Sequence, residues 1–179
     1  MSQQSQSTTY IGIALYAAEG FPVQRSIILS TSQRFDAAVW CATVIETVNG
    51  RVASWKLCDK TPATFEPYLT LMGIITIKKV KRSQDDIIWI ISSLGWNPLD
   101  YRDDLESHEY AEDYVRRVLL HLCSESVIRL SVTIKRDLDW QIELCLSELR
   151  KKRHEYKFNQ YPVIPLMLDG DIVFGQTVF

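Results

Sequence analysis

The first half of the chain alternates apolar runs with turn residues in the manner of β-strands. The apolar runs lie at residues 10–16, 25–29, 39–48, 51–58 and 72–80. Asn49-Gly50 is the strongest hairpin signal, because both residue types tolerate the positive φ angles that a type I′ turn requires. After it, residues 51–58 alternate between two faces, as a returning strand should. The pattern therefore predicts five strands, most of them joined by short turns.

The second half of the chain has helical periodicity instead. In residues 107–123, Val115, Val118, Leu119 and Leu122 recur at i, i+3, i+4 and i+7, which indicates one buried stripe on a helix. A shorter helix is expected after Asp85-Asp86, which can cap it, with its end at Gly95. A third helix is predicted over 137–153. The apolar runs 163–168 and 172–179 flank Asp169-Gly170 and suggest a terminal hairpin.

This order of elements predicts an α+β fold, in which an antiparallel sheet is packed by two or three helices. A doubly wound parallel sheet is disfavoured, because the first strands follow one another too closely to hold crossover helices. The 179 residues are enough for one domain with a sizeable core, which we expect over residues 9–179. The Ser/Gln-rich residues 1–8 are expected to form a disordered tail.

Charge and hydropathy exclude some partners. The formal net charge is −2, and the sequence pattern indicates no basic stripe of Lys and Arg. Because nucleic-acid binders usually have a basic face, we expect no nucleic-acid partner. The basic cluster at 150–153 ends a predicted helix, where positive charge complements the helix dipole; a targeting role is the alternative. We expect no membrane partner, because no apolar run approaches the length of a bilayer span. The polar N-terminus lacks a signal-peptide core, so a cytoplasmic location is expected.

Motifs for metals and cofactors are also lacking. Cys41, Cys58, Cys123 and Cys145 lie in apolar segments without a CxxC pair or a Cys/His cluster, which favours reduced thiols and no zinc site. The acidic stretch at 100–106 lacks the spacing and the glycine of a calcium-binding loop. GxGxxG, P-loop, GxSxG and HExxH motifs are absent from the sequence, so no cofactor is expected.

Four local strings carry a family resemblance. They are ALYA at 14–17, ITIKKV at 75–80, the helix at 110–122 with Tyr114-Val115, and Leu138-Asp139-Trp140. These strings resemble those of small fungal proteins of unknown function that are related to papain-like hydrolases of the NlpC, LRAT and PPPDE type. In that group the long helix reads Asn-Cys-x-x-Trp-Val, and the second strand usually begins with His-Trp. The resemblance implies a papain-like or NlpC-like fold.

The residues that would carry the family's chemistry differ. Hydrolysis needs a thiolate nucleophile and a histidine base that activates it. With Tyr114-Val115 aligned to Trp-Val, Ala111 occupies the cysteine position and Tyr110 the asparagine position, while Arg25-Ser26 occupies the His-Trp position. An alanine methyl group cannot attack a carbonyl, and arginine stays protonated. The resemblance therefore implies a scaffold that has lost its catalytic dyad.

Aromatic side chains are the remaining signal. We expect most of Trp40, Trp55, Trp89, Trp96, Tyr110, Tyr114 and Trp140 to lie in the core. A pocket lined by Trp and Tyr suits a planar, largely apolar ligand. If the fold is papain-like, the start of the long helix faces the early strands. The predicted pocket then contains Arg25, Ser26, Trp40, Trp55, Tyr110, Ala111 and Tyr114.

No catalytic residue is assigned from the sequence. Arg25, Tyr110 and His108 are the candidates, and His108 is more simply an exposed residue in the first turn of its helix. The preferred function is a catalytically degenerate scaffold, a pseudoenzyme, that binds a small apolar or aromatic molecule or a protein partner. The alternative is a small non-hydrolytic enzyme, a cyclase or isomerase of fungal secondary metabolism, with Arg25, Tyr110 and Tyr114 as hydrogen-bond donors.

A thiol hydrolase is the third interpretation. It would use Cys41 or Cys58, which lie in predicted strands without a helix N-terminus to lower the thiol pKa.

Overall fold

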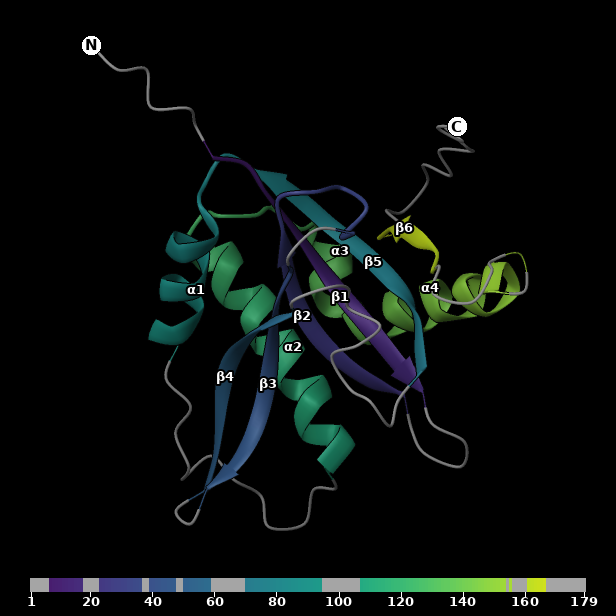
Figure 1. Ribbon diagram of the computed structural model, residues 1–179, viewed down its shortest axis with the longest axis horizontal. Helices are drawn as coiled ribbons and strands as arrows, with labels where there is room; N and C mark the ends of the chain where they lie inside the picture. Colours follow the sequence, from purple (N-terminus) through teal and green to yellow (C-terminus); the bar gives the residue numbers. More distant parts are fainter. Residues whose placement is uncertain are drawn as a thin grey trace.

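The sheet is the centre of the fold (Figure 1). The computed structural model describes residues 7–17, 23–36, 39–47, 50–58, 70–94, 107–153, 155 and 161–166. Its strands are β1 (Thr9–Ala17), β2 (Gln24–Ser30), β3 (Val39–Thr47), β4 (Gly50–Cys58), β5 (Thr70–Val80) and β6 (Val163–Pro165), in the spatial order β4-β3-β2-β1-β5-β6. Neighbouring strands are antiparallel except β5 and β6.

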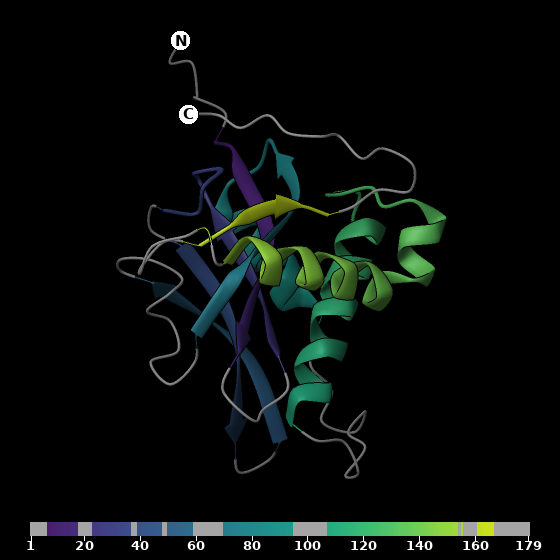
Figure 2. The same ribbon diagram turned by 90° about the vertical axis from the view of Figure 1, so that its right-hand side faces the viewer.

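The helices follow the first five strands along the chain. They are α1 (Gln84–Ser93), α2 (Ser107–Ser124), α3 (Val132–Arg136) and α4 (Leu138–Arg153). Figure 2 shows α2 and α4 on one side of the sheet, where α2 contacts β2 and α4 contacts β5. α1 contacts β4, and α3 packs against α4. The prediction of an α+β fold is confirmed, with a sheet that is mixed rather than purely antiparallel.

Alternation along the strands produces two cores. Odd-numbered residues of β1 and β2, such as Ile13, Ile27 and Leu29, face the helices and join the buried stripe of α2. Even-numbered residues, such as Ala14 and Ile28, belong to a second buried cluster on the opposite face. We refer to these as the helix-side core and the far-side core.

One close contact organises the far-side core. Phe35 lies in the turn after β2, has a positive φ of 55°, and is fully buried. Its ring atom Cζ lies only 2.9 Å from the place where a β-carbon on Gly12 would be. Glycine at position 12 therefore makes room for the ring. Positive φ is unusual for a bulky residue, and burial of the phenyl group, worth about 2–3 kcal/mol, offsets its cost.

Two local predictions need correction at the ends of elements. Ser83, not Asp85 or Asp86, caps α1: Ser83 Oγ accepts a hydrogen bond from Asp86 N, and Ser83 N donates to Asp86 Oδ2. Asp86 thus completes a capping box from the third helical position. The hairpin between β3 and β4 is confirmed, but Gly50 is a strand residue paired with Thr47. The register comprises nine cross-strand pairs, so Gly50 ends the ladder and is not one of the two residues that connect the strands.

The C-terminal part of the described chain also differs from the prediction. Residues 163–165 form β6, which pairs in parallel with residues 74–76 of β5. The short strand adds to an existing edge, which a sequence pattern for a local hairpin does not reveal. The second apolar run, 172–179, lies outside the described residues. The helix α3 was not expected, because five residues are too few to show a period.

Two of the seven aromatic residues, most of which were expected in the core, are exposed. Trp89 on α1 has 73% of its surface exposed, and Trp140 on α4 has 62%. Both lie on the solvent side of helices whose opposite side is buried. Helical periodicity predicted the buried stripes, whereas the aromatic content alone did not say which of the indoles would be exposed. None of the helices in the described part of the chain combines the length and apolar composition that crossing a bilayer requires.

Candidate functional site

Arg25 is the best-defined member of the predicted site. It lies on β2 in alternation with Ile27 and Leu29, so its side chain enters the helix-covered layer. Only 6% of the residue is exposed. Ser26, the next residue, belongs to the opposite face of the sheet by the same alternation. The structure therefore does not place Arg25 and Ser26 in one pocket, because neighbouring strand residues point in opposite directions.

The Arg25 guanidinium is held by two carboxylates of α4. Nη1 donates to Asp139 Oδ1 at 3.0 Å, and Nη2 donates to Glu143 Oε1 at 2.9 Å. Asp139 and Glu143 are four residues apart, so both reach the same side of the helix. The second oxygen of Asp139 lies 4.0 Å from Arg116 Nη1 on α2. We call this arrangement the Arg25 network; it joins β2, α4 and α2.

Burial explains why these partners are needed. A buried cation is costly unless it is paired and hydrogen-bonded. The side chain of Arg25 is 4% exposed, whereas those of Asp139 and Glu143 are 52% and 53% exposed. The carboxylates thus remain partly in water while they neutralise the buried charge. This geometry ties the sheet to α4, and it leaves Arg25 unsuited to act as a base.

Tyr114 and two tryptophans share the helix-covered layer with Arg25. Tyr114 on α2 is 5% exposed, and burial raises the pKa of its phenol far above its usual value. The phenol therefore stays protonated at neutral pH. Trp40 on β3 and Trp55 on β4 are half-buried against the helix-side core. Four of the predicted pocket residues thus contribute to one layer, as packing residues of the core.

The other predicted residues lie at the start of α2. The helix includes positions 108, 110 and 111. The side chains of His108, Tyr110 and Ala111 lie outside the described residues. The expected opposition of Ala111 and Arg25 therefore stays a prediction.

Of the two cysteines considered for a thiol hydrolase, the side chain of Cys41 is described and that of Cys58 lies outside the described residues. Cys41 and Cys145 are fully buried, and Cys123 is half-buried. Within the described ranges, no group of three or more His, Cys, Asp and Glu side chains is arranged to hold a metal ion. His121 Nε2 lies 3.0 Å from the carbonyl oxygen of Ile90 and 3.4 Å from Ser93 Oγ, so it joins α2 to α1.

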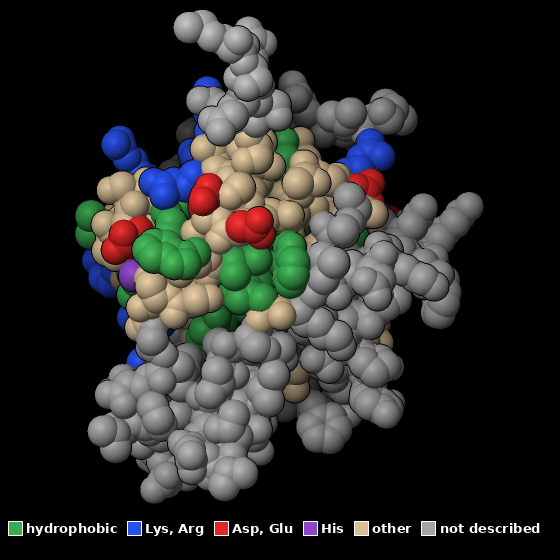
Figure 3. Space-filling model, turned by 60° about the vertical axis from the view of Figure 1, so that its left-hand side comes forward, with side chains coloured by type: hydrophobic (Ala, Val, Ile, Leu, Met, Phe, Trp, Pro, Cys, Tyr) green, Lys and Arg blue, Asp and Glu red, His purple; other side chains and the backbone are tan. Residues whose placement is uncertain are grey.

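The sequence patterns did not reveal two surface features. Residues 78–82, Lys-Lys-Val-Lys-Arg, form a basic run that continues from β5 toward α1, and four of the five residues are exposed. A simple count of charges in a short window would have found it. The second feature is the exposed side of α1, where Trp89 projects beside the half-buried Ile88. Figure 3 shows hydrophobic side chains gathered on the side of the molecule that carries α1.

The chain was compared with family models, curated proteins and solved structures. No family model matches the chain, and no curated protein or solved structure is significantly similar to it.

Proposed function

We propose that this chain is a catalytically degenerate papain-like scaffold that works by binding a protein partner. The observation that carries the proposal is the Arg25 network. Arg25 stands where the resembled family has its histidine, and its guanidinium is buried and bound by Asp139 and Glu143. A residue in this state stabilises the fold and does not accept a proton. The alanine at position 111 removes the second member of the dyad.

The choice of a protein partner over a small molecule is supported by the outer side of α1. Trp89 is exposed, Ile88 beside it is half-buried, and α1 contacts β4, which carries the half-buried Trp55. Tryptophan is enriched among the residues that dominate protein interfaces. Four of the five described residues of the predicted pocket, by contrast, contribute to the helix-covered layer, and Ser26 belongs to the opposite face of the sheet. Two N–H groups of Arg25 are already bound to carboxylates, in an arrangement that stabilises its charge inside the protein.

The first test is an activity assay with the full chain. Chromogenic ester, thioester and amide substrates should be hydrolysed no faster than in buffer with an equal concentration of an unrelated protein. Iodoacetamide should change nothing. Turnover that iodoacetamide abolishes would support a thiol hydrolase instead and would contradict the proposal.

The second test identifies the partner. Wild-type chain, Trp89→Ala and Trp140→Ala are used as equal baits, and the captured proteins are quantified by mass spectrometry. Trp140→Ala is the matched control, because it removes a similarly exposed indole from α4. A protein captured by the wild type and the control, and lost with Trp89→Ala, is the expected result. The candidate must then bind the purified wild type directly. Equal capture by all three baits would refute docking on α1.

A further inference from the structure

The basic run at 78–82 places four cations within five residues of the described chain. Lys78, Lys79, Lys81 and Arg82 are exposed, and only Val80 is buried. In the described part of the chain, none of these four cations is within ion-pair distance of a carboxylate. Cations and anions are normally interspersed on protein surfaces. We refer to these four side chains as the basic segment.

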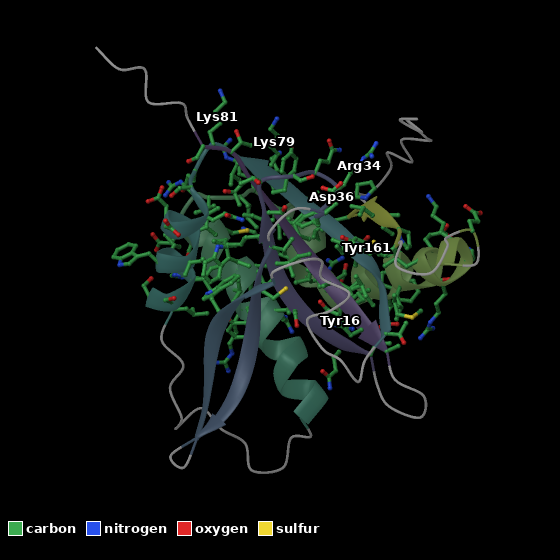
Figure 4. All side chains as sticks on the ribbon, in the orientation of Figure 1. Tyr16, Arg34, Asp36, Lys79, Lys81 and Tyr161 are labelled. Carbon is green, nitrogen blue, oxygen red and sulfur yellow. The ribbon has the colours of Figure 1, made fainter. Side chains whose placement is uncertain are left out.

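Contacts with β1 hold two residues of the basic segment. Lys79 pairs with Tyr10 of β1, and its Nζ lies 5.5 Å from the centre of the Tyr10 ring. Thr9 Oγ1 donates to the carbonyl oxygen of Arg82 at 2.8 Å, which holds the chain after β5 has ended. Figure 4 shows Lys79 and Lys81 projecting at one end of the molecule, where Arg34 also lies. Lys79 and Lys81 therefore lie at the same end of the molecule, whereas Lys78, the neighbour of Lys79 on β5, points to the opposite face of the sheet.

We propose that the basic segment binds an acidic segment of the protein partner that docks on α1. This inference rests on the proposed function and names the chemistry of the partner. α1 begins at Gln84, directly after the basic segment and the capping Ser83, and it carries Trp89 in its second turn. The charged and apolar surfaces therefore adjoin along one stretch of chain. An apolar anchor with charges at its rim is the usual arrangement of a protein interface.

The flanking charges favour an acidic peptide over other polyanions. Asp85 and Asp86 follow the basic segment, and Asp36 lies near Arg34 at the same end of the molecule (Figure 4). A nucleic-acid backbone or an anionic membrane would extend over these carboxylates and be repelled, as it would by the net charge of −2. A short acidic peptide can contact the cations without covering the carboxylates.

Protection of the sheet edge explains only part of the basic segment. Lysines on an outer strand discourage pairing with other chains. That role suits Lys78 and Lys79, because β5 lies inside the sheet order but pairs with β6 only over residues 74–76; Lys81 and Arg82 follow the end of the strand. Charges at the rim of an interface act mainly on the rate of association and on its salt dependence. The test is therefore made at two salt concentrations.

The probe is a fluorescein-labelled peptide with the sequence Glu-Glu-Leu repeated four times, and its Gln-Gln-Leu counterpart is the uncharged control. Fluorescence anisotropy measures Kd for the full chain and for Lys79→Glu/Lys81→Glu. The matched variant Arg150→Glu/Lys152→Glu makes the same change of charge on the exposed side of α4. We expect the first variant to weaken binding about tenfold at low salt, and the matched variant less than about twofold. High salt should weaken wild-type binding by a similar factor.

Several outcomes overturn the inference. One is equal weakening in both variants, which would mean that only the net charge matters. Another is absence of binding, or equal binding of the Gln-Gln-Leu peptide. A third is tighter binding of a uridine oligonucleotide or of phosphatidylserine vesicles that Lys79→Glu/Lys81→Glu abolishes. Trp89→Ala separates the two proposals: a partner that depends on Trp89 and ignores the basic segment preserves the proposed function and refutes this inference alone.

Discussion

Arg25 on β2 donates a hydrogen bond of 2.9 Å to Glu143 on α4, across 118 positions of the sequence. Its other terminal nitrogen binds Asp139. The two bonds join the second strand to the last helix, and they place a buried cation beneath two half-exposed anions. The two partners therefore differ in solvation: the guanidinium is buried, whereas the carboxylates remain in contact with water. Loss of the carboxylates should cost more stability than loss of the guanidinium.

This difference in solvation leads to the first prediction. The double variant Asp139→Asn/Glu143→Gln removes both negative charges that bind Arg25. Because the guanidinium then stays buried without an anion, the free energy of unfolding should fall by about 3 kcal/mol. Arg25→Met removes the buried charge and frees carboxylates that water can solvate, so it should cost clearly less. Urea denaturation of the three proteins measures both values. A larger loss with Arg25→Met than with the double variant would contradict this description of the network.

The second prediction concerns Gly12 and Phe35. A β-carbon at position 12 would lie 2.9 Å from Phe35 Cζ, so Gly12→Ala should destabilise the protein by about 1–3 kcal/mol through overpacking. When Phe35 is replaced by Leu, Gly12→Ala should lower the free energy of unfolding by a smaller amount. The difference should be roughly 0.5 kcal/mol or more, which is the interaction energy typical of residues in contact. Thermal unfolding of the four proteins in this cycle gives the coupling. Strict additivity would show that the two positions do not meet.

The third prediction is a dependence on alkaline pH at Tyr161. Its hydroxyl donates to the carbonyl oxygen of Phe35 at 2.7 Å, and burial raises its pKa to about 12, with smaller contributions from Asp36 and Cys41. Because the folded pKa exceeds the unfolded value near 10, the contribution of Tyr161 is complete below about pH 10. It is lost as the pH rises from about 10 toward about 12.

Urea denaturation at about pH 9 and about pH 11 measures this loss. The wild type should lose more stability between the two values than Tyr161→Phe, which has no proton to release. Tyr114 also has a raised pKa, and the comparison cancels its effect because both proteins retain it. Parallel pH profiles for the two proteins would show that the Tyr161 hydroxyl is not buried against Phe35.

The fourth prediction concerns the cap of α1. Ser83→Ala removes the acceptor for Asp86 N and should cost about 1 kcal/mol. Ser92→Ala, an exposed substitution near the other end of the same helix, is the control and should cost much less. Ser83→Asp, which can also accept this bond, should retain more of the stability than alanine does. Thermal denaturation distinguishes the variants, and equal midpoints for Ser83→Ala and Ser92→Ala would rule the cap out.

The sequence predicted those helices and strands whose hydrophobic periodicity is visible within a short window of residues. The stripe of Val115, Val118, Leu119 and Leu122 located α2 to within a residue, and alternating apolar runs located five strands. Contacts between distant residues were not predictable. The pairing of β6 with β5, the insertion of Phe35 opposite Gly12, and the binding of Arg25 by α4 each depend on positions far apart in the chain. No local pattern encodes such pairs.

The candidate site was predictable only in part for the same reason. Strand alternation by itself separates Arg25 from Ser26, because adjacent residues of a strand face opposite ways. The partners of Arg25 could not have been named, since Asp139 and Glu143 resemble any exposed acidic pair on a helix. The exposure of Trp89 follows from its position opposite Ile87 and Ile91 on α1, both of which are buried.

The affinity of the captured partner for purified wild-type chain, Trp89→Ala and Trp140→Ala is the most direct test of a function in binding. Isothermal titration at one salt concentration gives the three dissociation constants. We predict that Trp89→Ala raises Kd about thirtyfold, the effect of losing about 2 kcal/mol at a central interface tryptophan, and that Trp140→Ala changes it less than about twofold. Equal dissociation constants for the wild type and Trp89→Ala would contradict the account.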